Sequence, residues 1–574
     1  MQSYDRRSVL KGGLTLAVGF LSGCTATAAS TRGALSEFRP VPLGNYSRDG
    51  VTLSPDYEYQ ILIPWGTPLT PDGPEFSHPP SPQDQLQQIG IGHDGMTYFP
   101  LDGSSRRGLL VLNHEYGSNQ HVLGATTPTR IEQVHTSQHA HGLSIVEIEE
   151  QAGVWQTVAS PIARRVHVNT EMAFSGPVQG HALLHNSANN PVQGTLNNCA
   201  NGSTPWGTYL TCEENFNFYF GATADFAPNP SQQRYGFMAT GVGYDWHRFD
   251  PRWDLSNPAY ANEGNRFGWV VEVDPMDPKA RPIKRSALGR FKHEGAAVVE
   301  GMDGRIVVYM GDDEKFEFIY KFVSSENWRT LRARGISPLD EGTLYVARFD
   351  ADGSGEWLPL TIERPELAAK FADQADVLVN ARLAATELGA TPMDRPEWTT
   401  VAANGDVYCT LTNNDERKTA DAANPFAPNP HGHIIRWRDT DDHVGTRFSW
   451  NHFMLAANSY DSENSFGSPD GIWADPDGRL FICTDGNQAG GMPNQLLVAD
   501  TRTAELRRLL VGVPGCEITG ITATPDRRTL FINVQHPGNG LPSVTSFPLP
   551  FDGVSVPRDC TLVLRRNDGG LVGS

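Results

Sequence analysis

The sequence of 574 residues is poor in positive charge. It contains 46 Lys and Arg residues against 66 Asp and Glu residues, which gives a formal net charge of −20. A protein that binds the phosphate backbone of a nucleic acid needs a basic face, so nucleic acid is not expected as a partner. Most of the acidic side chains are expected to face solvent. The surplus of carboxylates is nevertheless what a site for hard cations would use.

Long hydrophobic runs are also missing. The one pronounced apolar stretch, residues 14–21, is too short to span a bilayer as a permanent helix. It follows the twin arginines Arg6 and Arg7, a pattern typical of Tat export signals. We therefore expect no stable transmembrane segment, the Tat machinery as a partner, and a periplasmic or extracellular location.

Two ways of processing this signal remain open. The small residues 26–28 offer a cleavage site, which predicts a signal peptide over residues 1–28 and a mature chain over residues 29–574. Residues 21–24 instead resemble a lipoprotein box, which would place a lipid anchor at Cys24. Soluble cleavage is the preferred alternative.

Cysteines are few, and their spacing suggests no disulfide framework. A chain of this length can bury a full core without disulfides. Cys409, Cys483 and Cys516 lie in or beside apolar runs and are interpreted as small buried hydrophobic residues. Cys212 differs because it precedes two glutamates at the end of an apolar stretch.

Stretches with helical periodicity are few, whereas 57 Gly and 41 Pro residues indicate a turn-rich β protein. Six strand-like runs each end in polar or metal-binding side chains, at residues 109–115, 206–215, 306–314, 407–415, 480–487 and 530–536. Each follows an acidic or polar loop, a first strand and a turn. Such a hairpin brings its beginning and its end to the same edge.

Six hairpins of this kind predict a six-bladed β-propeller, in which the innermost strands surround a channel. We expect one domain over residues 29–574 with large inserted loops and short helices. The clearest insertions, residues 219–269 and 368–393, are expected to cover the mouth of the channel.

Acidic side chains from the beginnings and ends of the hairpins should meet at one mouth of this channel. The beginnings supply Asp94, Glu294, Glu397, Asp470 and Glu517, and the ends supply Glu115, Cys212, Glu213, Asp312, Asp313, Asn413 and Asp485. Converging carboxylates repel one another unless they take up protons or hold cations. Oxygen ligands suit Ca²⁺, while a thiolate among them indicates a transition metal. The pattern favours a mixed site, such as iron with calcium.

Several motifs resemble the PhoX-type alkaline phosphatase family. They are residues 197–202, 204–215, 291–295, 309–314, 319–324, 393–398 and 468–471. The resemblance extends over nearly the whole mature chain and implies a six-bladed propeller whose channel holds Fe³⁺ and Ca²⁺. It also implies an exported enzyme that hydrolyses small phosphate monoesters. We expect a monomer.

The resemblance also assigns roles to individual residues. It implies that Arg395 binds the phosphate and that Arg395, Glu397 and Cys212 are catalytic. The implied metal ligands are Cys212, Glu213, Glu294, Asp312, Asp313, Glu397, Asn413, Asp470 and Asp485. The chemistry would be metal-assisted transfer of the phosphoryl group to water.

Two other functions stay open from the residues themselves. A calcium-dependent propeller hydrolase, acting on lactones or phosphotriesters, would use a similar ring of carboxylates. A secreted binding module stapled by calcium would need no catalytic residues at all. Iron would favour the phosphatase, and calcium alone would favour the other two.

Overall fold

The computed structural model describes residues 35–574. The expected signal peptide and Cys24 lie outside the described residues. Within residues 35–574, none of the helices has both the length and the hydrophobicity that crossing a membrane requires. The six cysteines of this part are all unpaired and buried, which confirms the interpretation of Cys409, Cys483 and Cys516.

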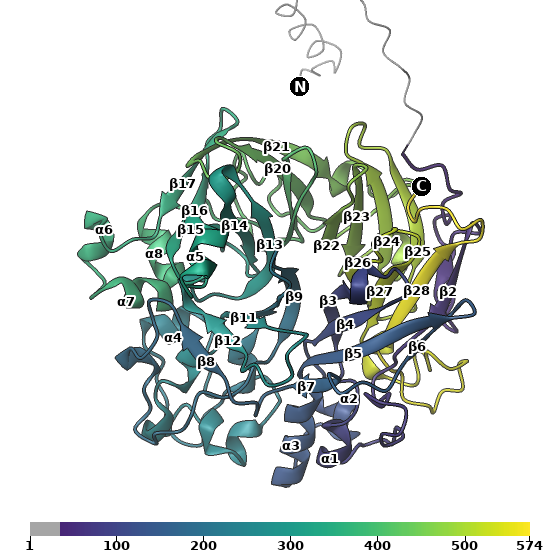
Figure 1. Cartoon of the computed structure of the whole chain (residues 1–574), viewed down its shortest axis with the longest axis horizontal. Helices are drawn as coiled ribbons and strands as arrows, with labels where there is room; N and C mark the ends of the chain where they lie inside the picture. The colour runs from purple at the N-terminus through teal and green to yellow at the C-terminus, as the bar shows by residue number, and fades with distance from the viewer. Residues whose placement is uncertain (1–34) are drawn as a thin grey trace, which may run out of the picture. The chain divides into compact units, whose positions relative to one another are not determined.

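The described residues form a mostly β structure of antiparallel sheets (Figure 1). The first sheet contains β3 (His93–Pro100), β4 (Arg107–His114), β5 (Gly142–Gln151) and β6 (Val154–Thr157), with β7 (Arg164–Val166) paired to β5. The second contains β9 (Asn198–Ser203), β10 (Tyr209–Glu213), β11 (Val270–Val273), β12 (Ile283–Arg285) and β8 (Ala173–Ser175). Strand β8 is parallel to β12.

Two antiparallel runs share the largest sheet. The first run is β13 (His293–Glu300), β14 (Arg305–Asp312), β15 (Ile319–Asn327), β16 (Gly342–Phe349) and β17 (Ser354–Pro359). The second is β18 (Pro396–Val401), β19 (Val407–Leu411), β20 (His433–Asp439) and β21 (Arg447–Leu455). They join through their outer strands, since β17 pairs with β21.

The last two sheets use strands from both ends of the described chain. One contains β22 (Pro469–Ala474), β23 (Arg479–Thr484), β24 (Gln495–Asp500), β25 (Leu506–Val511) and β1 (Thr52–Leu53). The other contains β26 (Glu517–Ala523), β27 (Leu530–Gln535), β28 (Cys560–Arg566) and β2 (Tyr57–Ile61). Pairing of β1 with β25 and of β2 with β28 ties the beginning of this part to its end.

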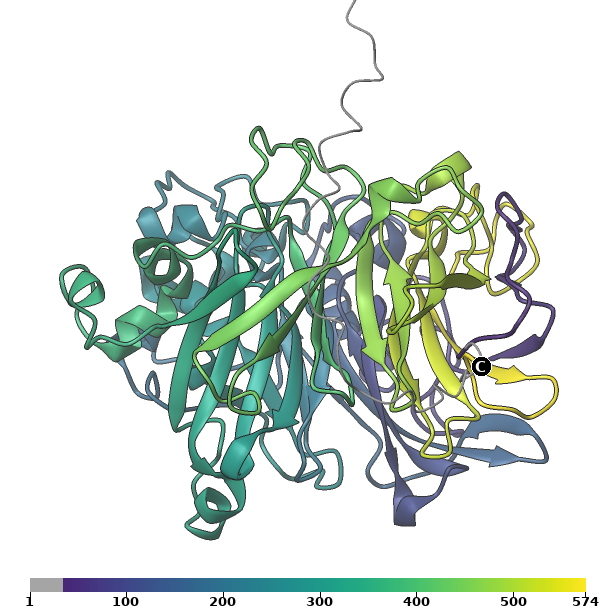
Figure 2. The ribbon, with the colours of Figure 1, turned by 90° about the horizontal axis from the view of Figure 1, so that it is seen from above.

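The helices are short. The α-helices are α1 (Pro82–Gln85), α2 (Asn119–Leu123), α3 (Ile131–Ala140), α4 (Pro230–Arg234), α5 (Trp328–Ala333), α6 (Pro365–Ala368), α7 (Gln374–Val379) and α8 (Ala381–Glu387). The 3₁₀ helices are η1 (Leu101–Gly103), η2 (Ala182–Leu184), η3 (Phe216–Tyr219), η4 (Trp246–Arg248), η5 (Pro251–Trp253), η6 (Pro258–Tyr260), η7 (Glu263–Arg266), η8 (Ser286–Leu288), η9 (Met302–Gly304), η10 (Ala456–Asn458), η11 (Ala489–Gly491) and η12 (Pro537–Gly540). Most lie in loops beyond the strand ends (Figures 1 and 2).

The first strands of the antiparallel runs are neighbours. Strand β3 contacts β9, and the series continues through β13, β18, β22 and β26 until β26 contacts β3 again. These six inner strands therefore form a closed ring, and Figure 1 shows them on the inner side of the sheets. The beginnings of six separate segments are brought together by this closure.

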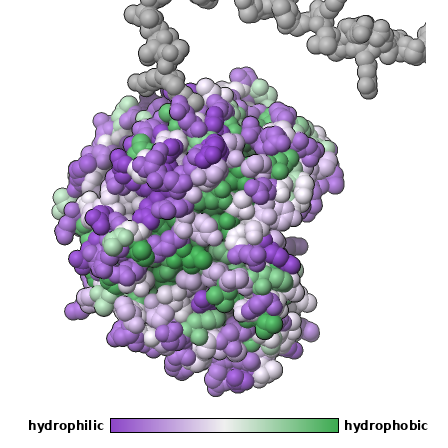
Figure 3. All heavy atoms as spheres, turned by 90° about the vertical axis from the view of Figure 1, so that its right-hand side faces the viewer, coloured by the Kyte–Doolittle hydropathy of each residue, from purple (hydrophilic) through white to green (hydrophobic). Residues whose placement is uncertain are grey.

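Hydrophobic residues fill the spaces between neighbouring sheets. Strands β10 and β19 are buried at every position, as are residues 306–312 of β14. Strands that are covered on both faces have continuous apolar sequences, without the alternation of apolar and polar residues. This explains the six strand-like runs of the sequence. The outer face that carries β2 and β28 is mainly hydrophilic, with a hydrophobic band across its middle (Figure 3).

Candidate active site and metal centre

Each inner strand places one side chain at the equivalent position, close to its own beginning. It is the second residue of β3, β9, β13, β18 and β22, and the first residue of β26. We call these the opening residues: Asp94, Cys199, Glu294, Glu397, Asp470 and Glu517. All six are buried. Since the six strands contact one another in a closed ring, their opening residues converge.

The backbone around the opening residues repeats as well. Each inner strand has a shift of pairing register at or just after its opening residue, as between His93 and Met96 of β3. A β-bulge of this kind changes the direction of a side chain. Two residues before five of the opening residues the backbone is left-handed, at Gly92, Asn197, Arg395, Ser468 and Gly515.

Each inner strand and the strand that follows it in the sheet form a hairpin, which we call a module. A second residue of each module reaches the ring, namely the first residue after the second strand of the module. We call these the closing residues: Glu115, Glu214, Asp313, Thr412, Asp485 and His536. In the first five modules the closing residue's backbone N–H donates to the carbonyl two residues before the opening residue, as from Glu115 to Gly92 (2.8 Å). The same bond in five modules shows that these positions are structurally equivalent.

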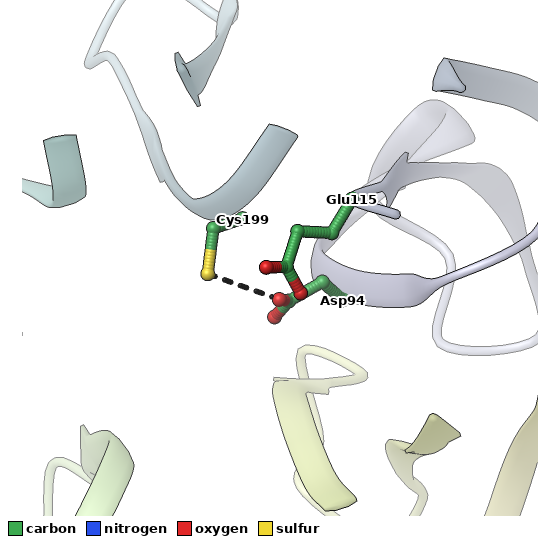
Figure 4. Close-up of side chains that lie close together, drawn as sticks. All are labelled: Asp94, Glu115 and Cys199. Atoms are coloured by element: carbon green, nitrogen blue, oxygen red, sulfur yellow. Dashed lines mark hydrogen bonds between the residues drawn. The ribbon is translucent and has the colours of Figure 1, made fainter. Parts of the chain in front are cut away.

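Cys199 lies at the centre of the closest contacts. Its Sγ lies 2.7 Å from Oε1 of Glu294 and 3.0 Å from Oδ2 of Asp94. Figure 4 shows that Asp94, Glu115 and Cys199 point toward one another from three different segments. The amide of Gln535 donates to both carboxylates, at 3.2 Å to Asp94 and 2.9 Å to Glu115. Thiol and carboxylates are thus held within the reach of one ion.

The ring contains four groups of three residues each. Within each group, the atoms that could bind a metal ion lie within 4.8 Å of one another. The groups are Asp94 with Glu115 and Cys199; Cys199 with Glu214 and Glu294; Glu294 with Asp313 and Glu397; and Asp485 with Glu517 and His536. Cys199 and Glu294 each belong to two groups, so the first three groups are continuous, whereas the fourth shares no residue with them. This arrangement can hold more than one cation.

The electrostatics of the ring favour the binding of cations. Burial raises the pKa of six of its carboxylates well above the usual range, and neighbouring carboxylates raise it further; these are Glu115, Glu214, Glu294, Glu397, Asp470 and Glu517. Burial also raises the pKa of the Cys199 thiol well above its ordinary value. Bound cations would stabilise the charged forms of all these groups, so the donor set fits a metal centre.

Arg395 is held at the edge of the ring by Asp313. Its Nε donates to Oδ1 of Asp313 (2.8 Å) and its Nη2 to Oδ2 (2.7 Å), and Nη2 also lies 2.9 Å from Oε1 of Glu397. Burial alone would raise the pKa of Asp313, but the charge and hydrogen bonds of Arg395 outweigh it and lower that pKa. This pairing fixes the guanidinium plane and leaves the Nη1 group for another acceptor.

The ring opens into a cavity of about 540 Å³. Its lining comprises Glu115, Tyr116, Ser118, Asn119, Gln120, Thr126, Asn197, Cys199, Glu214, Asn215, Phe218, Val242, Gly243, Tyr244, Glu294, Asp313, Arg395, Glu397, Asp470, Asp485 and Glu517. Within the described part of the chain, eight carboxylates and one guanidinium line this cavity. It therefore suits a dianionic ligand only when cations are bound beside Arg395.

The cavity brings together many of the residues expected from the sequence. Glu294, Asp313, Arg395, Glu397, Asp470 and Asp485 line it, as do Glu115 and Glu517. Asp94 joins them through its contact with Cys199. The first expected insertion contributes Val242, Gly243 and Tyr244, so it borders the site as expected. The second contributes none of the lining residues.

The position expected for Cys212 was wrong. Cys212 is fully buried in the hydrophobic core with Leu210, Trp269 and Ala296. It still lies within β10, where neighbouring sheets cover both faces, whereas the closing residue Glu214 comes after the strand has ended. Cys199, not Cys212, is the thiol that faces the carboxylates.

Glu213 and Asp312 were expected at the ring, but each lies one residue before the residue that faces the cavity. Glu213 forms a fully buried ion pair with Lys284 (2.5 Å), and Asp312 forms one with Arg382 of α8, whose Nε lies 2.9 Å from Oδ2. Successive side chains of an extended chain point to opposite sides. The next residue in each case, Glu214 or Asp313, therefore faces the cavity.

Asn413 is half-buried and does not line the cavity. Strand β19 ends at Leu411, and it is Thr412 that reaches the ring, where its hydroxyl donates to Oε1 of Glu397 (2.6 Å). Thr412 therefore supports a carboxylate at this closing position, and the expected contribution of Asn413 is corrected.

Among the opening and closing residues, the sequence did not identify Cys199, Glu214, Thr412 and His536. Cys199 precedes the second hairpin where Asp94 and Glu294 precede theirs. Applying the rule for the opening residues to every hairpin would have selected it. Predicting Glu214 would require knowing exactly where β10 ends, and the continuous run 206–215 does not indicate that end.

Comparisons with known proteins show the family to which the chain belongs. A family model described as alkaline phosphatase PhoX matches residues 37–538. The structure of Pseudomonas fluorescens PhoX in complex with vanadate, a transition state analogue, is 43% identical, with a TM-score of 0.88 over 94% of this chain and 100% of that chain. A search of curated proteins found no match.

Two further solved structures are much less similar. A protein of unknown function from Dyadobacter fermentans is 10% identical, with a TM-score of 0.34 over 83% of this chain and 97% of that chain. A gluconolactonase from Xanthomonas campestris is 12% identical, with a TM-score of 0.28 over 85% and 97%.

The fold, the site and the family match define a metal-dependent hydrolase of phosphoric monoesters. The chain belongs to the PhoX alkaline phosphatase family. This membership decides among the three functions left open by the residues: the protein is a phosphatase, rather than a lactonase or a binding module without catalytic activity.

Proposed function

We propose that the protein hydrolyses small phosphate monoesters at a mixed centre of Fe³⁺ and Ca²⁺ held by the opening and closing residues. The observation that carries this proposal is the Cys199 thiol, which lies within 3.0 Å of two carboxylates in a buried ring beside Arg395. A thiolate selects a transition metal from among oxygen ligands. The other carboxylates are the donors that calcium prefers.

The positions of the donors suggest how the ions would be divided. Iron would be held by the two groups that share the sulfur of Cys199. Their other members are Asp94 and Glu115 in one group and Glu214 and Glu294 in the other. Glu397, Asp313, Asp470, Asp485 and Glu517 would hold calcium through oxygen atoms. When bound, such cations neutralise the phosphate oxygens and generate a nucleophile from water at moderate pH.

The chain's own residues contribute binding and orientation. Asp313 occupies the Nε and Nη2 edge of Arg395, so Nη1 is the group that would donate to the phosphate. The left-handed backbone at Arg395 (φ 57°) and its ion pairs fix the guanidinium before a substrate arrives. A donor held in advance lowers the cost of stabilising the charge of the transition state.

The fold is proposed to be one six-bladed β-propeller. Support comes from six antiparallel runs, each beginning with an inner strand, and from the closed order of contacts among those strands. Pairing of β2 with β28 would close the last blade. We also propose Tat-dependent export to the periplasm or beyond, on the basis of Arg6 and Arg7, and a single domain that acts as a monomer.

Removal of calcium tests this function. EGTA is expected to abolish hydrolysis of p-nitrophenyl phosphate and to lower the melting temperature together, because carboxylates of separate modules would then face one another. Ions present at 1,000 times their dissociation constant stabilise a fold by about 4 kcal/mol, which corresponds to a shift of roughly 4 °C in a chain of this size. Activity and melting temperature are measured on the same samples.

Two controls accompany this measurement. EGTA saturated with calcium should have no effect, and added calcium should restore both properties. Loss of activity without any change in melting temperature would show that the ring does not hold structural ions.

A further inference from the structure

The lining of the cavity contains two chemically different sets of residues. The ring and Arg395 form an acidic floor, whereas Tyr116, Phe218, Val242 and Tyr244 form an apolar and aromatic wall. We call these four residues the aromatic wall. Val242 is 44% exposed, although it lines the same cavity as the carboxylates. An exposed apolar side chain inside a cavity is typical of a binding surface.

The wall is built and held by contacts between distant segments. The Asn119 amide at the start of α2 donates to the carbonyls of Gly243 (2.9 Å) and Tyr244 (3.1 Å). Tyr244 stacks on Tyr219 with ring centroids 4.3 Å apart, and the Tyr219 hydroxyl accepts from Asn197 (3.1 Å). The wall is thus tied to the residue two positions before Cys199, and its placement is fixed in the absence of substrate.

The reaction geometry directs the organic part of a substrate toward this wall. In a phosphoryl transfer the attacking and leaving oxygens lie roughly in line on opposite sides of phosphorus. Cations held by the ring residues would supply the nucleophile from that part of the lining, so the leaving oxygen would point toward the rest of the cavity. Beyond the ring residues and Arg395, the lining contains Phe218, Val242 and Tyr244.

We propose that the aromatic wall is a subsite for the leaving group and favours aryl phosphates over small polar phosphate esters. This inference rests on the proposed phosphatase function and adds its substrate class. Aromatic faces bind planar apolar groups through area and ring stacking.

The test compares two substrates in matched variants. For Val242→Asn, the ratio of kcat/KM for 1-naphthyl phosphate to that for glycerol 2-phosphate is expected to fall about tenfold. Asparagine is uncharged, so the phosphate side keeps its electrostatics. The matched control is Val154→Asn, because Val154 is 55% exposed on β6 and is not part of the lining. It should leave the ratio unchanged.

A second variant and a binding measurement keep the test independent of turnover. Phe218→Ser should lower the same ratio. Calorimetry should show that both wall variants lose affinity for 1-naphthylmethylphosphonate relative to methylphosphonate. A ratio within twofold of wild type in both variants would overturn the subsite. If wild-type, metal-loaded protein hydrolyses neither substrate, the proposed function fails, and this inference fails with it.

Discussion

Replacing Cys199 by alanine is expected to remove iron from the protein and to lower kcat for p-nitrophenyl phosphate by at least about 100-fold. Loss of a residue that merely supports a metal ligand typically costs 10- to 100-fold, and Cys199 is proposed as a ligand itself. Its sulfur is the one soft donor among the residues that line the cavity in the described chain. Iron content and kcat are measured on protein exported by its own signal.

Cys212→Ala is the matched control for this experiment. Cys212 is also buried and lies on β10, which pairs directly with β9. Because it packs in the core, its replacement should cost about 1 kcal/mol of stability and leave iron and kcat unchanged. Iron retained in Cys199→Ala but lost in Cys212→Ala would contradict the site described above and restore the first expectation.

Arg395→Lys is expected to lower kcat/KM for p-nitrophenyl phosphate by about 100-fold, which corresponds to losing roughly 2.7 kcal/mol of transition-state stabilisation. Arginine can pair with Asp313 through Nε and Nη2 while Nη1 reaches the phosphate. A lysine ammonium keeps the charge but has no planar set of donors. It can therefore satisfy either Asp313 or the phosphate with good geometry, not both.

Arg234→Lys controls for the general effect of this substitution. Arg234 is 30% exposed and pairs with Glu317 (2.8 Å), while Arg395 is 23% exposed and pairs with Asp313 (2.7 Å). The control should change kcat/KM less than twofold. Metal content should stay at the wild-type level in both variants. Loss of iron from Arg395→Lys would show that Arg395 holds the ring together instead of binding phosphate.

The sequence predicted a mostly β structure because each hairpin has a clear local pattern. Apolar runs such as residues 306–310 are continuous, since sheets cover both of their faces, and the acidic residue at the beginning of five of the six hairpins lies at the ring. Strand closure then brings these residues together. Asp94, Glu294, Glu397, Asp470 and Glu517 were therefore located from the pattern alone.

The ends of the second strands were harder to locate. A strand that is buried throughout contains no alternation to mark which face a residue occupies. Cys212, Glu213 and Asp312 follow apolar runs as closely as the true closing residues do. A shift of one residue reverses the direction of a side chain, which is why Glu213 and Asp312 proved to be partners of Lys284 and Arg382.

The aromatic wall could not be predicted from the sequence. Tyr116 and Val242 are 126 positions apart in the chain and carry no shared motif. They meet because Asn119 binds the backbone of residues 243 and 244. Contacts of this kind depend on the path of a loop, which hydrophobic periodicity does not encode.

X-ray absorption at the iron edge, on protein exported by its own signal, tests the central claim most directly. The proposed centre predicts iron in the wild-type protein with sulfur among its nearest neighbours, and this sulfur should persist in Cys212→Ala. Wild-type protein that is active but contains no iron, or iron surrounded by oxygen and nitrogen alone, would contradict Cys199 as the thiolate ligand of the centre.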